Sequence, residues 1–241
     1  MLIQRYTFRA DIKKCQSQGK TVLMSIGGST WKESYPTPDA ATKAAQKTKA
    51  AQKLWDTVGP VNKDVKIPRP FGDAVVDGFD FDYETKVTNL VPAAEHLRQL
   101  ADSDKSKKFY LTAAPQCVYP DAMVGDMLNN VALDAIWVQF YNNKCGIQSF
   151  VPGQRPQPNF TMEQWDGWAK GPSKNKDVRV FVGVPGSKAA ATSGYMDPEA
   201  LVPLFNFSKS FSSFGGVMIW DVSAAYSNGD FVGKIKHELT G

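Results

Sequence analysis

The sequence predicts an α/β fold in which short apolar strands alternate with helical segments. Residues 21–26 form a continuous, mostly apolar run, which is typical of a parallel strand covered on both faces. Alternation of such strands with helices indicates a parallel sheet. Polar and aromatic residues stand where several of these strands end, and this favours a closed barrel, whose chemistry lies at the carboxyl ends of its strands. The six expected strands cover residues 21–26, 77–84, 109–115, 135–141, 178–184 and 215–220.

Helical segments are expected between these strands. In the first, Ile12 and Cys15 have helical spacing and Gly19 marks the end. The second carries a direct repeat, because residues 42–47 recur as residues 48–53, and it is rich in strong helix formers. Residues 161–164 resemble a capping box that opens a helix. The expected helices cover residues 9–19, 37–55, 91–101 and 121–130 and begin again near residues 161 and 197.

Length and composition set limits on the class of protein. A chain of 241 residues is long enough for one barrel, so residues 1–241 are expected to form a single catalytic domain. The net charge of +4 is small and the lysines are scattered, so no nucleic-acid partner is predicted. No apolar run reaches the roughly 20 residues of a membrane helix. The three cysteines include no Cys-x-x-Cys pair, which gives a zinc site little support. No oligomeric state is indicated.

The stretch Asp77–Glu84 combines acidic residues with a buried strand pattern. In an extended chain Asp80, Asp82 and Glu84 share one face, roughly 7 Å apart from one to the next. Crowded carboxylates resist simultaneous ionisation, so one or two of them are expected to hold a proton near neutral pH. General acid catalysis needs such a group. Asp77 falls on the opposite face, and we expect a structural role for it.

Other readings of this acidic stretch were weighed. A calcium loop needs Gly at its sixth position and Glu at its twelfth, whereas counting from Asp80 gives Thr85 and Val91. A solvated polar edge strand stays open, because one face of such a strand can be buried. An open dinucleotide-binding sheet is disfavoured, since no Gly-x-Gly-x-x-Gly follows a strand.

The stretch Asp77-Gly78-Phe79-Asp80-Phe81-Asp82-Tyr83-Glu84 resembles the Asp-x-x-Asp-x-Asp-x-Glu signature of family 18 glycoside hydrolases. Ser25-Ile26-Gly27-Gly28 resembles the Ser-x-Gly-Gly motif of that family's third strand. Residues 111–117, 137–143 and 215–220 resemble the class III, hevamine-like chitinases of plants and fungi, and the resemblance extends from about residue 9 to 235. It implies a (β/α)8 barrel of the TIM type and an endo-acting, retaining chitinase that acts on chitin or its oligosaccharides without metal or cofactor.

The resemblance also implies roles for individual residues. Glu84 would be the general acid, and the N-acetyl group of the substrate would be the nucleophile. Asp82 would orient that amide and stabilise the oxazolinium charge, Asp80 would share a proton with Asp82, and Tyr141 would bind the acetamido oxygen. Trp220 would form the apolar floor under the sugar ring. Further substrate contacts are implied for Gln139, Asn142, Met218 and Gly28.

Several features of the chain suit a secreted glycoprotein. The resemblance implies a disulfide between Cys117 and Cys145. Glycosylation sequons begin at Asn159 and Asn206. Residues 1–5 are not followed by the apolar segment of a signal peptide, so secretion is expected with a signal peptide that is not part of this chain.

The chain departs from the family pattern at its beginning. The strand at residues 21–26 corresponds to the family's third strand, and only 20 residues precede it. The first two barrel strands are therefore expected to be missing. A barrel of about six strands would have open edges, and we expect such a fragment to fold poorly alone.

Two alternatives to a chitinase stay open. A chitin-binding lectin or inhibitor on the same barrel would have lost catalysis, and such proteins typically lose the terminal Glu or a neighbouring acid. All three acids are present here. An endo-β-N-acetylglucosaminidase that cuts the chitobiose core of N-glycans is the other alternative.

Overall fold

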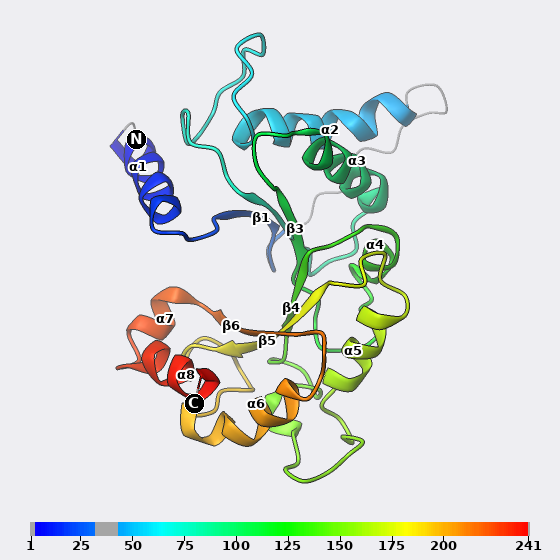
Figure 1. Cartoon of the computed structure of the whole chain (residues 1–241), viewed down its shortest axis with the longest axis vertical. Coiled ribbons are helices and arrows are strands. Elements are labelled where there is room, and N and C mark those ends of the chain that lie inside the picture. Colours follow the sequence, from blue (N-terminus) through cyan, green and yellow to red (C-terminus); the bar gives the residue numbers. More distant parts are fainter. Residues whose placement is uncertain (1–2, 32–42, 241) are drawn as a thin grey trace. The chain divides into compact units, whose positions relative to one another are not determined.

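The structure is a computed structural model that describes residues 3–31 and 43–240 (Figure 1). It comprises two compact units. The first contains residues up to Thr112 together with Asp126–Ala132, and the second contains Ala113–Gly125 and the residues from Leu133 onward. Within these residues six strands alternate with helices, and β1 pairs with β2, β4 with β5 and β5 with β6, in each case in parallel. The predicted α/β fold with six strands is confirmed.

The first unit holds the acidic strand. Its strands lie where the sequence predicts them, whereas the first helix begins at Ile3 rather than at residue 9 and the fourth at Gly125 rather than at residue 121. The expected helix start at residues 37–39 lies outside the described residues. Its elements are α1 (Ile3–Ser17), β1 (Leu23–Gly27), α2 (Lys43–Val58), β2 (Gly78–Asp82), α3 (Leu90–Ser103), β3 (Tyr110–Ala113) and α4 (Gly125–Asn130).

The aromatic side of β2 packs into the core of this unit. Phe79 and Phe81 are buried, and the Trp55 ring on α2 lies 6.0 Å from the Phe79 ring and 4.8 Å from the Phe109 ring. On its other face Asp80 is only 7% exposed. The reading of this stretch as a solvated edge strand is therefore wrong.

The second unit contains three parallel strands and most of the short helices. Two helices near the carboxyl terminus, α7 and α8, were not predicted. The helix expected from residue 197 begins as a turn of 3-10 helix. The elements are β4 (Ala135–Gln139), η1 (Ile147–Ser149), α5 (Met162–Lys170), β5 (Arg179–Pro185), η2 (Pro198–Leu201), α6 (Val202–Lys209), β6 (Phe214–Trp220), α7 (Val222–Tyr226) and α8 (Phe231–Thr240).

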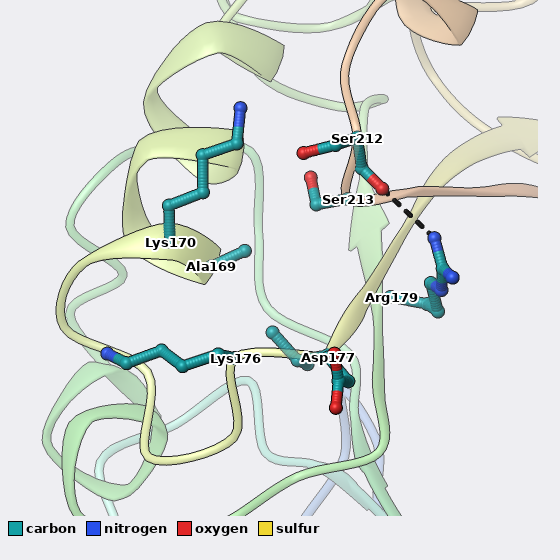
Figure 2. A pocket seen from close by; sticks show the side chains of 8 residues that line it. Ala169, Lys170, Lys176, Asp177, Arg179, Ser212 and Ser213 are labelled. Atoms are coloured by element: carbon teal, nitrogen blue, oxygen red, sulfur yellow. Dashed lines mark hydrogen bonds between the residues drawn. The ribbon is translucent and has the colours of Figure 1, made fainter.

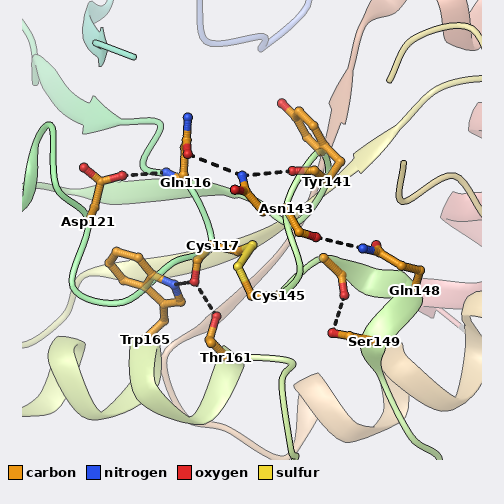
Figure 3. Close-up of a disulfide and its surroundings, with 11 residues drawn as sticks. Gln116, Cys117, Asp121, Tyr141, Asn143, Cys145, Gln148, Ser149, Thr161 and Trp165 are labelled. Atoms are coloured by element: carbon orange, nitrogen blue, oxygen red, sulfur yellow. Dashed lines mark hydrogen bonds between the residues drawn. A yellow bond between two sulfur atoms is a disulfide. The ribbon is translucent and has the colours of Figure 1, made fainter. Parts of the chain in front are cut away.

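The start of α5 differs from the capping box that the sequence predicts. Thr161 precedes the helix, but its side chain makes no capping hydrogen bond. The Thr161 hydroxyl instead donates to the carbonyl oxygen of Cys117 at 2.6 Å, and the Trp165 indole N–H donates to the same oxygen at 3.3 Å (Figure 3). Cys117 forms the expected disulfide with Cys145, whereas Cys15 is a free, exposed thiol. The Thr161 hydroxyl thus donates to a carbonyl distant in sequence instead of accepting from a backbone N–H of the helix.

Asp77, just before β2, contacts the end of α1 and the residues that precede β1 and β3. Its Oδ2 accepts from the Gln16 side chain at 2.9 Å and from the backbone N–H of Val22 at 2.8 Å. Its Oδ1 pairs with Lys107 Nζ at 2.6 Å. Although burial opposes its charge, these partners hold the pKa of Asp77 below its usual range. The expected structural role agrees with these contacts.

We predict that Asp77→Asn lowers the free energy of unfolding at pH 7 by about 2 kcal/mol, because hydrogen bonds to a charged group are lost. A group whose folded pKa is depressed stabilises the fold above its unfolded pKa and loses this contribution as pH falls. The difference between variant and wild type, measured by urea denaturation, should therefore shrink below pH 4. Asp73→Asn is the matched control, because the Asp73 side chain is 52% exposed beside Arg9 and Lys13. An equal loss in both variants would contradict the prediction.

Candidate functional site

Asp80 lies at the centre of the acidic strand and accepts hydrogen bonds from both neighbouring strands. Ser25 Oγ on β1 donates to its Oδ2 at 2.8 Å, and Thr112 Oγ1 on β3 donates to its Oδ1 at 2.6 Å. The parallel register places Ser25 opposite Asp80. Both donors stabilise the charged carboxylate inside a buried environment.

The turn after β1 brings the backbone close to Asp82. Gly27 lies opposite Asp82 in the register, and a Cβ at Gly27 would clash with the Asp82 carbonyl. Both Gly27 (φ +115°) and Gly28 (φ +91°) have backbone angles that favour glycine. The Gly28 N–H donates to the Asp82 carbonyl at 2.5 Å. The glycines therefore let β1 end directly beside the acids, while a substrate contact by Gly28 stays a prediction.

Burial and mutual repulsion change the protonation of the acids. Burial raises the pKa of Asp82 to about 7, and the negative charges of Glu84 and Asp80 add to this effect. Burial also raises the pKa of Glu84 above its ordinary value. The raised pKa of Asp82 agrees with the expectation that one of these carboxyl groups holds a proton near neutral pH. Such a cluster can donate a proton from one carboxyl group while a second carboxyl group stabilises a positive charge.

Sequence reasoning assigned no role to Ser25 or Thr112. Both residues stand on strands next to β2, and the side chain of each reaches Asp80. Ser25 belongs to the Ser-x-Gly-Gly motif, but its hydrogen bond to Asp80 was not predicted. The register that joins it to Asp80 is a property of the folded sheet.

The second unit carries the other predicted site residues at the carboxyl ends of β4 and β6. Tyr141 follows β4 and is 5% exposed, and Gln139 donates from Nε2 to the Ala114 carbonyl at 3.1 Å. Figure 3 shows the Tyr141 ring pointing away from the disulfide, to the same side as the Gln116 side chain. On β6, Trp220 is 48% exposed, and Met218 two residues earlier is half-buried.

Asn142 holds a loop in the second unit. Its backbone is left-handed (φ 58°). Its Oδ1 accepts from the N–H and the hydroxyl of Thr192, both at 2.8 Å. The side-chain oxygen is thus already engaged within the protein, and the substrate contact predicted for Asn142 stays a prediction.

A cavity of about 170 Å³ lies at the other end of this unit's sheet, where Arg179 begins β5 (Figure 2). Its lysines, Lys170 and Lys176, point in different directions in Figure 2. Lys170 pairs with Asp166, Lys176 donates to backbone carbonyls, and Arg179 donates to the Ser212 carbonyl at 3.0 Å. The three positive side chains of this cavity are thus already bound by groups of the protein. The candidate site is therefore placed at the carboxyl ends of the strands, where the acids lie.

Residues 3–31 and 43–240 also bear on other classes of site. Within these ranges, no group of three or more His, Cys, Asp or Glu side chains is arranged to hold a metal ion. None of the described helices is long and apolar enough to cross a membrane. The sequon residues Asn159 and Asn206 are both exposed; their glycosylation stays a prediction.

Comparisons with known proteins identify relatives along most of the chain. A sequence model of the glycosyl hydrolases family 18 matches residues 3–194. The chain is 50% identical over 232 residues to a class III chitinase of Arthroderma benhamiae, covering 95% of this chain and 69% of the relative. It is 42% identical over 238 residues to Endochitinase 33 of Trichoderma harzianum, covering 99% of this chain and 72% of the relative.

A solved structure extends the comparison to the fold. The xylanase and α-amylase inhibitor protein from Scadoxus multiflorus is similar, with a TM-score of 0.77 and 34% identity. The similarity covers 96% of this chain and 79% of that protein. Together with the family match, it confirms the predicted α/β fold of the barrel type.

The raised pKa of Asp82 predicts an unusual dependence of stability on pH. Between pH 4 and about 7 the folded state binds more protons at Asp82 than the unfolded state, so this residue makes stability fall as pH rises. Asp82→Asn should therefore be more stable than wild type at pH 8, by about 2 kcal/mol. Urea denaturation at pH 8 and pH 4 tests this, with the difference expected to shrink at pH 4. A variant less stable than wild type at pH 8 would refute the prediction.

Proposed function

Because the chain belongs to the glycosyl hydrolases family 18, we propose that it is an endo-acting chitinase that cleaves β-1,4 links between N-acetylglucosamine units. The acid cluster at the end of β2 carries this proposal. It places Glu84, with a raised pKa, two residues from Asp82, whose pKa is about 7. The 50% identity to a protein named a class III chitinase supports the choice of substrate.

Glu84 acts as the general acid. Because burial raises the pKa of Glu84, this residue keeps its proton to a higher pH than an exposed glutamate does. It transfers this proton to the glycosidic oxygen as the bond between that oxygen and C1 breaks. The carbonyl oxygen of the substrate's own acetamido group attacks C1 and forms an oxazolinium ion. Water then attacks C1, the carboxylate of Glu84 takes its proton, and the configuration at C1 is retained.

Asp82 stabilises the intermediate. Its carboxyl group accepts a hydrogen bond from the acetamido N–H, which orients the carbonyl oxygen toward C1, and its negative charge offsets the oxazolinium charge. Asp80 prepares this role. Because Ser25 and Thr112 stabilise the charge of Asp80, that charge favours a proton on Asp82 before the substrate binds.

For residues of the second unit, the resemblance to family 18 supports further substrate contacts. The Tyr141 hydroxyl binds the acetamido oxygen, and the exposed indole of Trp220 forms the apolar floor under the sugar ring. Further contacts are proposed for Gln139, Met218 and Asn142. A backbone contact with the substrate is proposed for Gly28, whose backbone angle (φ +91°) other residues rarely adopt.

The second candidate function is a carbohydrate-binding or inhibitory protein on the same fold. The inhibitor from Scadoxus multiflorus favours it, because that protein shares 34% of its residues with this chain. The presence of Asp80, Asp82 and Glu84 favours catalysis. Action on the chitobiose core of N-glycans is a third candidate, because the same substrate-assisted chemistry would serve it.

A secreted location is also proposed. The Cys117–Cys145 disulfide is of the kind that persists in oxidising compartments. Two exposed sequons, at Asn159 and Asn206, point in the same direction.

We predict that Glu84→Gln lowers kcat for chitin oligomers by about 10²-fold or more, because general acid catalysis typically contributes this much. Binding of the oligomers should persist, since the amide has nearly the same shape. Turnover is measured by product release from chitotetraose or longer oligomers, and binding by calorimetry. Glu199→Gln is the matched control, because Glu199 is an exposed glutamate paired with Lys234. Undiminished turnover of Glu84→Gln would refute the assignment.

Substrate choice is tested by offering wild-type protein two substrates in parallel. The proposed chitinase releases products from chitin oligomers and leaves the N-glycans of a glycoprotein intact. Mass spectrometry of both reactions reads the outcome. Release of glycans alone would replace the proposal with an endo-β-N-acetylglucosaminidase, and binding of chitin without any cleavage would favour the lectin or inhibitor.

A further inference from the structure

Residues 28–31, which follow β1, are attached to the end of the acidic strand at three points. The Gly28 N–H donates to the Asp82 carbonyl at 2.5 Å. The Trp31 ring lies 6.2 Å from the Tyr83 ring, edge to face at 70°. The Thr85 hydroxyl donates to the Trp31 carbonyl at 2.8 Å. All three contacts lie within the first unit.

Glu84 stands between two of these attachment points. Tyr83 before it and Thr85 after it both contact Trp31. Strand β2 ends at Asp82, so Glu84 lies beyond the last strand residue. Its place thus depends on contacts outside the β2 strand itself.

Trp31 is itself fixed, which makes it a suitable anchor. Its N–H donates to the Gly28 carbonyl at 3.0 Å and closes a short turn. Gly28 is in turn bound to the Asp82 carbonyl. The acceptor for the Thr85 hydroxyl is therefore held in place by the same strand that carries the acids.

We propose that Thr85 is a positioning residue for Glu84: by donating to the Trp31 carbonyl, its hydroxyl holds the chain that follows Glu84 against residues 28–31, as the Tyr83 ring does on the other side of Glu84. Thr85 acts through this backbone contact rather than by touching the substrate. The inference rests on the proposed function of Glu84 as the general acid. It adds a residue outside the acidic motif to the machinery that places the proton.

The expected effect is on turnover rather than on substrate binding. A general acid must lie within hydrogen-bond distance of the leaving oxygen, and a displacement of about 1 Å can cost as much as 10²-fold in rate. Val has the shape of Thr but lacks the donor, whereas Ser keeps the donor. The pair Thr85→Val and Thr85→Ser therefore separates the hydrogen bond from the packing.

The experiment measures kcat and KM of both variants on chitin oligomers. Thr85→Val should lose about tenfold in kcat with KM nearly unchanged, and Thr85→Ser should stay near wild type. The matched control is Thr57→Val, which removes a hydroxyl that donates to the Lys53 carbonyl on α2 in the same unit. Wild-type turnover in Thr85→Val, or an equal loss in Thr85→Ser or Thr57→Val, would overturn the inference.

A second readout does not depend on activity. Hydrogen exchange should speed up at the Trp31 and Gly28 amides in Thr85→Val and stay as in wild type in Thr85→Ser. If wild-type protein cleaves no chitin oligomer, the proposed function fails and the exchange data decide whether Thr85 anchors residues 28–31. Unchanged exchange at both amides in Thr85→Val would overturn the anchoring role, even in an active enzyme.

Discussion

The first unit is organised around the cost of burying carboxyl groups at the end of one strand. A buried carboxylate is stable only when hydrogen bonds or opposite charges replace its water. Asp80 receives hydroxyl donors from β1 and β3 and can stay charged. Asp82 lies next to that charge, and its pKa is raised to about 7. The two acids thus meet the same burial in different ways, and this difference separates their chemical roles.

This arrangement explains why β1 ends as it does. Ser25 must face Asp80 to supply a donor, and two residues later Gly27 must pass the Asp82 carbonyl at a distance that excludes a Cβ. Gly28 then donates to that carbonyl and begins the turn that the Trp31 N–H closes. A hydroxyl residue and two glycines at fixed spacing are therefore requirements of the neighbouring acidic strand. The Ser-x-Gly-Gly motif and the acidic motif thus supply the two partners of one contact between β1 and β2.

The sequence predicted features that depend on local periodicity. The alternation in β2 correctly placed aromatic residues in the core and acids on the other face. The raised carboxyl pKa was expected from crowding, whereas its larger cause is burial, to which the neighbouring charges add. Features that depend on register were missed, because the sequence does not say which residue of β1 or β3 faces Asp80. The capping hydrogen bond predicted at Thr161 was wrong, because its hydroxyl donates to the Cys117 carbonyl, which folding brings near, instead of accepting from a backbone N–H of the helix.

The proton on Asp82 links stability to the proposed reaction. Asp82 titrates near neutral pH because its surroundings disfavour its charge. A substrate that brings an amide N–H and a developing positive charge supplies the two interactions that favour the charged form. Substrate binding would therefore lower the cost of a negative charge on Asp82, and this effect grows as the oxazolinium charge develops. An interaction that is stronger in the transition state than in the ground state is what accelerates a reaction. The instability of the acid cluster in the free protein is thus part of how it would catalyse.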